Sequence, residues 1–152
     1  MIEKRKVVLV GTGFVGMSMA YSLLNQGGIN ELVLIDVLKD KAVGEAMDLS
    51  HGVPCAPAKI DIKAGDYDEC KDADIVVVAC GIPKLLKKEM IKEGSVVIDV
   101  GISRVDGKIV GDIDFDNIKD IALFVTPNPG GIGPMTIAMI IDNLIEMGEV
   151  NE

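Results

Sequence analysis

A glycine-rich turn between a predicted strand and a predicted helix is the feature that most constrains the fold of this sequence. The turn has the pattern Gly-x-Gly-x-x-Gly and reads Gly11-Thr12-Gly13-Phe14-Val15-Gly16. The β-branched run Val7–Val10 precedes it directly, and the amphipathic stretch Phe14–Leu24 begins within it. Asp36 ends the next predicted strand, 20 residues after Gly16. This order of strand, turn, helix, strand and acid predicts a βαβ unit that binds a dinucleotide.

Each residue type in this unit has its own physical role. Gly11 permits the tight turn, Gly13 lets the backbone approach a pyrophosphate at the helix N-terminus, and Gly16 allows close packing of helix and strand. Asp36 can accept hydrogen bonds from the ribose hydroxyls of adenosine, and its charge opposes a 2′-phosphate. NAD is therefore predicted to bind in preference to NADP. A purely structural turn with three glycines is the alternative.

The alternation of short apolar runs and amphipathic stretches continues along the chain. Six strands are predicted, over 7–10, 32–35, 59–63, 75–79, 96–100 and 122–125. Four helices are predicted, over 14–24, 41–49 (with Asp40 as N-cap), 85–92 and 134–147. The third strand is expected at a sheet edge, and Val105-Asp106-Gly107-Lys108 predicts a hairpin turn. The fold class predicted is α/β, a three-layer doubly wound parallel sheet of Rossmann type with strand order 3-2-1-4-5-6.

Composition narrows the setting of this fold. A length of 152 residues favours one domain, and the net charge of −9 argues against a nucleic-acid partner. No apolar run reaches the roughly 18 residues of a membrane span. Cys55, Cys70 and Cys80 are scattered and odd in number, which favours reduced thiols and a cytoplasmic location.

The first half of the chain, from Lys6 to about Pro83, resembles the cofactor domain of the lactate/malate dehydrogenase family. The resemblance rests on the runs at 10–17 (Val-Gly-Thr-Gly-Phe-Val-Gly-Met), 31–37 (Glu-Leu-Val-Leu-Ile-Asp-Val), 46–52 (Ala-Met-Asp-Leu-Ser-His-Gly), 65–67 and 72–81. It implies a cofactor loop at the glycines, a ribose-binding acid, an adenosine side and a backbone segment that passes the nicotinamide ribose. The cofactor-binding residues expected in this half are Gly11, Gly13, Phe14, Val15, Gly16, Asp36, Val37, Lys41, Tyr67, Cys80, Gly81 and Ile82.

The second half, from about Ala73 to Met147, resembles the cofactor domain of bifunctional methylenetetrahydrofolate dehydrogenase/cyclohydrolase. The matching runs lie at 90–102, 104–115 and 129–136, the last reading Pro-Gly-Gly-Ile-Gly-Pro-Met-Thr. The resemblance implies that Ile102 contacts the cofactor. Asn128 departs from the folate family, and it matches the Thr-Asn-Pro strand end of lactate and malate dehydrogenases, where the Asn faces the nicotinamide. A turn-capping role is the alternative for Asn128.

Together the two resemblances imply a chimera that forms one dinucleotide-binding domain over 1–152. Its dehydrogenase-like half is 1–83, its folate-enzyme-like half is 84–152, and the shared strand at about 73–83 joins them. Laboratory construction is the expected origin, with natural recombination as the alternative. An apolar face left by a missing partner domain could drive formation of a homodimer.

The substrate domains of both resembled families are not found in the sequence. His51 matches an ordinary helix end, and Arg5 and Arg104 lie at a terminus and in a turn. We therefore expect no catalytic residue and a protein that is not an enzyme. Residual NAD(P)-dependent dehydrogenase activity and a folded scaffold without a cofactor are the alternatives.

Other polar groups are interpreted as structural. No metal site is expected, because the spacing of the acids at 99, 112, 114 and 116 fits no calcium loop. Cys80 has no His in a partner position, which favours a buried thiol over a nucleophile. The lysines at 84, 87 and 88 are interpreted as a solvated face.

Overall fold

A six-stranded parallel sheet organises the chain in the computed structural model, which describes residues 5–149. The strand order is β3-β2-β1-β4-β5-β8, which confirms the predicted Rossmann topology, with β8 as the sixth strand of the sheet. The outermost residues of the predicted 1–152 domain, 1–4 and 150–152, lie outside the described part. The strands are β1 (Lys6–Val10), β2 (Glu31–Ile35), β3 (Asp61–Ala64), β4 (Ile75–Val78), β5 (Val96–Asp99) and β8 (Phe124–Val125).

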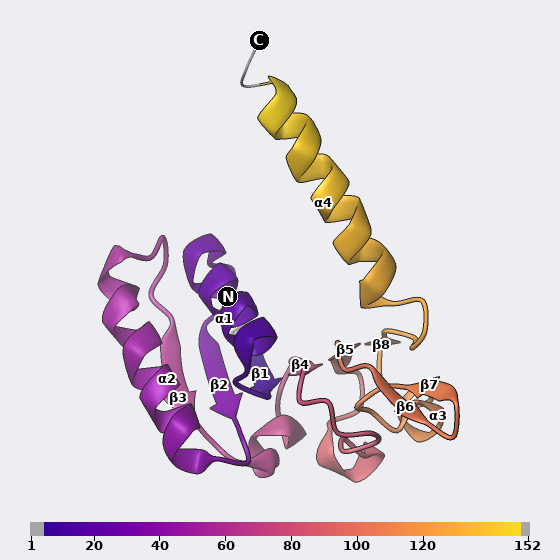
Figure 1. Cartoon of the computed structure of the whole chain (residues 1–152). Coiled ribbons are helices and arrows are strands. Elements are labelled where there is room, and N and C mark those ends of the chain that lie inside the picture. Colours follow the sequence, from indigo (N-terminus) through magenta and orange to yellow (C-terminus); the bar gives the residue numbers. More distant parts are fainter. Residues whose placement is uncertain (1–4, 150–152) are drawn as a thin grey trace.

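Elements pack on both faces of the sheet, which gives three layers (Figure 1). The helices α1 (Phe14–Gln26) and α2 (Lys39–Gly52) pack on one face of the sheet. Shorter elements cover the other face: η2 (Tyr67–Lys71), η3 (Lys88–Met90) and α3 (Phe115–Ile118). A 3-10 turn, η1 (Val53–Cys55), follows α2. The edge position predicted for β3 is confirmed.

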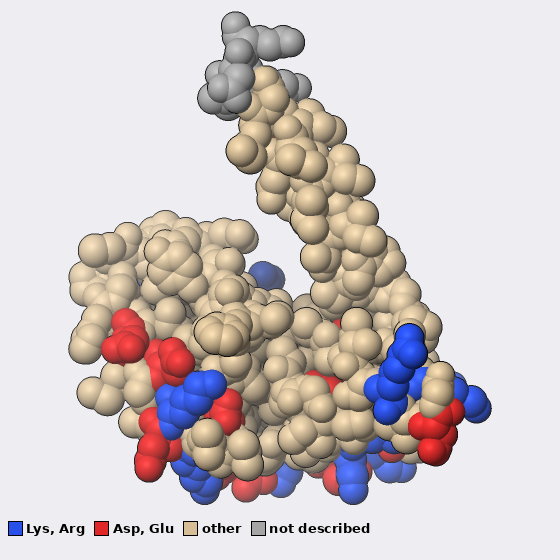
Figure 2. Space-filling view, viewed as in Figure 1, with Lys and Arg blue, Asp and Glu red and all other residues tan. Residues whose placement is uncertain are grey.

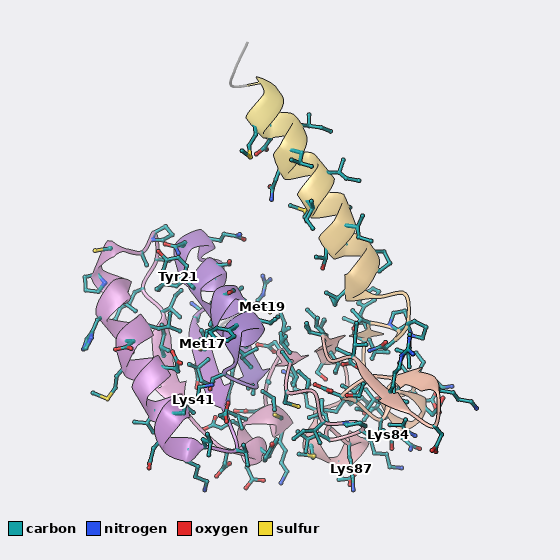
Figure 3. The ribbon with its side chains drawn as sticks, in the orientation of Figure 1. Met17, Met19, Tyr21, Lys41, Lys84 and Lys87 are labelled. Atoms are coloured by element: carbon teal, nitrogen blue, oxygen red, sulfur yellow. The ribbon has the colours of Figure 1, made fainter. Side chains whose placement is uncertain are left out.

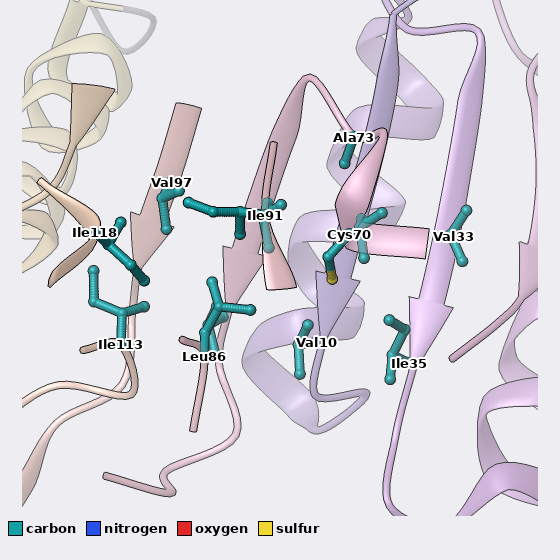
Figure 4. Packing of buried hydrophobic residues seen from close by; sticks show 13 residues of the cluster. Val10, Val33, Ile35, Cys70, Ala73, Leu86, Ile91, Val97, Ile113 and Ile118 are labelled. Atoms are coloured by element: carbon teal, nitrogen blue, oxygen red, sulfur yellow. The ribbon is translucent and has the colours of Figure 1, made fainter. Parts of the chain in front are cut away.

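The buried cluster beneath the shorter elements contains residues from both halves of the chain (Figure 4). Val10, Val33 and Ile35 come from the first half, and Leu86 and Ile113 from the second. Their side chains are at most 2% exposed. The strands at the centre of the sheet are apolar on both faces, as parallel strands between two layers must be.

Three predictions about local structure are wrong. Residues 85–92 form no helix beyond the three residues of η3, because Leu86 bridges to Ile113 in an extended conformation. Asp40 does not cap α2, which begins two residues earlier than predicted, at Lys39, with Leu38 at the N-cap. The last strand is two residues long rather than four.

The predicted hairpin is confirmed as β6 (Ser103–Val105) and β7 (Lys108–Val110). Asp106 and Gly107 have φ angles of 50° and 78°. Two successive positive φ angles are typical of a tight two-residue turn between antiparallel strands.

The last helix, α4 (Ile132–Glu149), projects away from the sheet (Figure 1). Its side chains from Gly133 to Gly148 are exposed. The surface of α4 in Figure 2 carries few charged groups. The charged side chains visible in this view gather at the end of the molecule opposite the tip of α4. Among the described residues, none of the helices is long and apolar enough to cross a membrane.

Candidate functional site

A cleft opens at the carboxyl ends of β1, β2 and β4, where strand order reverses and doubly wound sheets bind their ligands. Its floor is the glycine turn, and its sides come from the ends of β2 and β4. Residues that line it are Val10, Gly11, Gly13, Asp36, Val37, Lys41, Tyr67, Ala79, Cys80, Ile82 and Leu85.

The three glycines of the turn meet different surroundings. Gly11 has a φ of 103°, and a Cβ added there would lie 2.5 Å from the carbonyl oxygen of Ala79. A Cβ on Gly16 would lie 2.0 Å from the carbonyl oxygen of Gly11. A Cβ on Gly13 would meet nothing within 4 Å. Gly11 and Gly16 therefore serve the packing of the turn, whereas Gly13 keeps open the space before the N-terminus of α1.

That N-terminus is suited to an anion. The first N–H groups of a helix have no partner inside the helix, and the helix dipole is positive there. Gly13 occupies the N-cap of α1 without a capping side chain, and the first turn contains no acidic residue. A phosphate at this position would therefore meet N–H donors and no competing carboxylate.

Asp36 lies at the end of β2 and is held by the glycine turn. The backbone N–H and the hydroxyl of Thr12 donate to Asp36 Oδ2 over 2.9 and 2.7 Å, and the Leu38 N–H donates to Oδ1 over 3.0 Å. Burial raises the pKa of this carboxyl, but these hydrogen bonds and the Lys41 ammonium lower it by more. Asp36 is therefore a fixed negative charge at the wall of the cleft.

The opposite wall is built by the end of β4. The N–H groups of Cys80 and Gly81 both donate to Asp112 Oδ2, over 2.8 and 2.7 Å, and Asp112 is not among the residues that line the cleft. The Cys80 thiol lies 3.2 Å from the same oxygen. Burial, together with this hydrogen bond to Asp112, raises the pKa of the Cys80 thiol to about 12. The thiol therefore stays protonated, which agrees with a buried thiol rather than a nucleophile.

The structure brings together part of the predicted cofactor-binding set. The predicted residues that line the cleft are Gly11, Gly13, Asp36, Val37, Lys41, Tyr67, Cys80 and Ile82. Gly16 is buried in α1, while Phe14 and Val15 are 97% and 60% exposed at its start. Gly81 follows the lining residue Cys80 directly.

The two predicted residues of the second half lie beyond this cleft. Ile102 is 66% exposed after β5. The Asn128 side-chain amide donates to the carbonyl oxygen of Gly101 over 2.5 Å, so it ties two loops together. This contact joins residues 27 apart in the sequence, so it is neither the predicted cofactor contact nor the turn-capping alternative for Asn128.

Three residues that line the cleft are absent from the predicted set: Val10, Ala79 and Leu85. Thr12 and Asp112, which hold the walls of the cleft, are absent from it as well. Leu85 was assigned to a helix, although it lines the cleft. Thr12 and Asp112 act through tertiary hydrogen bonds, which no local pattern reveals. The sequence signal for Thr12 is its place inside the glycine turn, between Gly11 and Gly13.

A second cavity, of about 480 Å³, lies at the amino ends of β4 and β5, on the opposite edge of the sheet. Its residues include Arg5, Asp74 and Lys92, and Lys92 Nζ lies 2.6 Å from Asp74 Oδ1. Its lining residues include the turn glycine Gly94, but no residue of the Gly11–Gly16 turn or of the N-terminus of α1. The cleft at the carboxyl ends is therefore the better candidate.

The groups interpreted as structural have separate surroundings. Asp114 accepts from Asn117, and Asp116 lies 3.7 Å from Lys119. Within residues 5–149, no three His, Cys, Asp or Glu side chains are arranged to hold a metal ion. His51 is exposed on α2. Figure 3 shows Lys41 on α2, with Lys84 and Lys87 among the loops of the other half.

Comparison with known proteins places these features in a family. The profile described as "Tetrahydrofolate dehydrogenase/cyclohydrolase, NAD(P)-binding domain" matches residues 54–152. The chain belongs to this family. The solved structure of the bifunctional enzyme FolD from Campylobacter jejuni superposes over 99% of the chain and 45% of its own, with a TM-score of 0.74 and 33% identity.

Closer identities are confined to halves of the chain. Bifunctional protein FolD of Sulfurihydrogenibium sp. is 64% identical over 75 residues, which are 49% of the chain and 26% of that protein. L-lactate dehydrogenase 2 of Lactococcus lactis is 60% identical over 81 residues, 53% of the chain and 26% of that protein. Both resemblances noted from the sequence are thus confirmed.

One prediction is contradicted by the family. The Campylobacter jejuni relative is a methylenetetrahydrofolate dehydrogenase/cyclohydrolase, so the expectation of a protein that is not an enzyme is wrong. That expectation rested on the substrate domains not found in the sequence. The chain spans about a quarter of the length of the curated relatives it matches, so what the sequence lacks says nothing about the whole protein.

Proposed function

We propose that this chain supplies the cofactor-binding part of a FolD-type dehydrogenase and that its cleft binds NAD. The observation that carries the proposal is the placement of Asp36 beside the N-terminus of α1 in one cleft. The helix N-terminus would hold the pyrophosphate, and Asp36 would face the adenosine ribose. When bound, the nicotinamide would supply hydride transfer.

The preference for NAD over NADP follows from the charge of Asp36. The carboxylate has four lone-pair positions on its two oxygens, and three N–H or O–H donors of the protein already use part of them. A ribose hydroxyl can still donate to Oδ1, whereas a 2′-phosphate would approach a charged acceptor. Lys41 Nζ, 4.0 Å from Oδ2, offsets this repulsion only in part.

Calorimetric titration with NAD and then NADP tests the proposal. We expect NAD to bind at least about tenfold more tightly, since one like-charge contact costs on the order of 1 kcal/mol at a partly exposed site. Asp36→Asn keeps an acceptor for Thr12 and removes the charge. It should therefore weaken the binding of NAD, strengthen the binding of NADP and so narrow the difference between the two affinities. Equal affinities for the two cofactors in the unaltered protein would contradict the proposed preference.

We also propose that the chain is a chimera joined near β4. The support is the pair of half-length matches, each at 60% identity or more, to two different enzyme families. Because the two resemblances share the segment at about 73–83, which contains β4, a junction there would keep the sheet continuous. The site residues of the first half and the loops of the second would then meet at the same edge.

Partners other than the cofactor are inferred from charge and surface. The net charge of −9 opposes binding to nucleic acid, and the free thiols of Cys55, Cys70 and Cys80 are suited to the reducing cytoplasm. A second copy of the chain is the proposed protein partner, through the exposed apolar residues of α4.

A further inference from the structure

The carboxylate of Asp112 is fully buried between two loops at the carboxyl ends of β4 and β5. It lies in the second half of the chain, yet it accepts the N–H groups of Cys80 and Gly81 from the first half. Both bonds reach the same oxygen, Oδ2. Asp112 is therefore a direct polar link between the two halves at the rim of the cleft.

The surroundings of Asp112 leave it no freedom to move. A Cβ added to Gly101 would lie 2.0 Å from Asp112 Cγ, so only glycine allows the carboxylate to sit there. The Asp112 N–H donates to Asp99 Oδ1 over 3.0 Å, which fixes the backbone of the same residue. Asp112 Oδ1 is buried and has no hydrogen-bond partner in the described structure.

This arrangement determines which way the end of β4 faces. If the Cys80 and Gly81 N–H groups had no buried acceptor, the segment would turn them toward water in the cleft, because an unpaired buried N–H is costly. Asp112 instead draws both groups inward. The Gly81 carbonyl, on the other side, accepts the Ser103 hydroxyl over 3.2 Å.

The strand order tells which part of a dinucleotide this wall would meet. Asp36 follows β2, the glycine turn follows β1, and Cys80 follows β4, so these groups form a row along the sheet edge. A dinucleotide with its adenosine at Asp36 and its pyrophosphate at Gly13 places its second nucleoside beside Cys80 and Gly81.

We propose that Asp112 is a positioning residue that shapes the half of the cleft for the second nucleoside of the cofactor. This inference rests on the proposed function. Asp112 acts through the Cys80–Gly81 segment and does not itself line the cleft. Removing the Asp112 side chain should therefore weaken binding of the complete dinucleotide and leave unchanged the binding of a ligand that ends at the pyrophosphate.

Binding of NAD and of ADP to the same variants tests this role. In Asp112→Ala we expect the Kd for NAD to rise about tenfold, the effect of one charge-assisted hydrogen bond, and the Kd for ADP to stay within about twofold. Asp112→Asn can keep an oxygen toward the two N–H groups with its NH₂ in the place of Oδ1. Its Kd for NAD should fall between those of the wild type and Asp112→Ala.

Asp74→Ala is the matched control. Asp74 also accepts a backbone N–H, that of Lys6 over 2.8 Å, but it lies at the opposite edge of the sheet. We expect Asp74→Ala to lower the melting temperature and to leave the ratio of the two Kd values unchanged. If Asp112 had only a structural role, Asp112→Ala would likewise lower the melting temperature and leave the ratio of the two Kd values unchanged. Equal fold-changes in the Kd for NAD and the Kd for ADP in Asp112→Ala would therefore overturn the proposal.

Hydrogen exchange on the unaltered protein keeps the proposal testable if Asp112→Ala does not fold. The Cys80 and Gly81 amides should exchange slowly without cofactor and faster in Asp112→Asn. Rapid exchange of both amides in the wild type would overturn the inference. If the wild type does not bind ADP, the proposed function is contradicted as well. If the wild type binds ADP but the ratio of the Kd for NAD to the Kd for ADP is the same in the Asp112 variants as in the wild type, this inference alone is contradicted.

Discussion

At the scale of single residues, two glycines of the same turn have different roles, one in the stability of the fold and the other in ligand binding. Gly16→Ala forces a Cβ to within 2.0 Å of a backbone oxygen, whereas Gly13→Ala meets no atom within 4 Å. We expect Gly16→Ala to lower the free energy of unfolding by about 3 kcal/mol. Gly13→Ala should lower the free energy of unfolding by less than about 1 kcal/mol, which is the difference between Gly and Ala at an N-cap. It should nevertheless weaken the binding of NAD, because the new methyl group occupies the space for the pyrophosphate.

Urea unfolding and NAD titration of both variants measure the two effects. Gly44→Ala is a control, because a Cβ there also meets nothing within 4 Å and Gly44, on α2, is not itself one of the lining residues. NAD affinity that is the same in Gly13→Ala and the wild type would show that no ligand approaches this glycine.

The residues that sequence reasoning could identify are those with a local signature. Gly11, Gly13 and Asp36 follow from the spacing of a glycine turn and the next strand end. Thr12 and Asp112 could not be assigned, because their partners lie 24 and at least 31 residues away in the sequence. Such contacts form only when the sheet brings strand ends together.

At the scale of elements, a small ion-pair cluster ties the sheet to η2. Lys6 of β1 donates to Glu69 of η2 over 2.6 Å, and Lys63 of β3 lies 3.1 Å from the same carboxylate. The hydrogen bond from Lys6 lowers the pKa of Glu69, and Lys63 adds to this effect. Because the folded-state pKa is lowered, Glu69 stabilises the protein above the ordinary pKa of a glutamate and loses this effect as the pH falls.

Glu69→Gln should therefore lower the free energy of unfolding by about 1 kcal/mol at neutral pH and cost progressively less as the solution is acidified. Urea unfolding across this pH range measures the difference. Asp68→Asn is the control, because the Asp68–Lys71 pair is exposed and is expected to contribute little. A loss in Glu69→Gln that does not change with pH would show that the charge of Glu69 is not the cause.

Elements with a clear period were predicted more accurately than those set by tertiary contacts. The glycine-rich turn and the apolar runs gave β1, α1 and β2 to within two residues at each end. The prediction of a helix over 85–92 is wrong because the order of charged and apolar residues there matches a helix, while the bridge of Leu86 to Ile113 requires extended backbone. Lys84 also has a φ of 55°, which interrupts a helix at its start.

At the scale of the whole molecule, one buried cluster crosses the proposed junction. Val33 and Ile35 pack in the same cluster as Leu86, Val97 and Ile118, although the two groups lie on opposite sides of the junction. The two halves should therefore unfold in a single transition. Fluorescent probes attached singly on α2 and on the β6–β7 hairpin should report the same urea midpoint, and separate midpoints would show that the halves fold independently.

The exposed helix α4 leads to the last prediction for the whole molecule. An apolar stripe with helical spacing runs along it: Ile137, Ile140, Ile141, Leu144 and Ile145. Each of these side chains is more than half exposed. Isolated helices of this length are marginal in water, so α4 gains stability by packing its stripe against another apolar surface.

We expect two copies of the chain to pair through this stripe, with Asp142 and Glu146 on the outer side of the pair. Sedimentation velocity should then show a coefficient that rises with protein concentration. Leu144→Asp places a charge in the stripe and should weaken association by at least about tenfold. Asn143→Asp adds the same charge on the polar side, one residue away, and should leave association unchanged. If both variants sediment like the wild type at every concentration, the stripe on α4 is not the contact between copies.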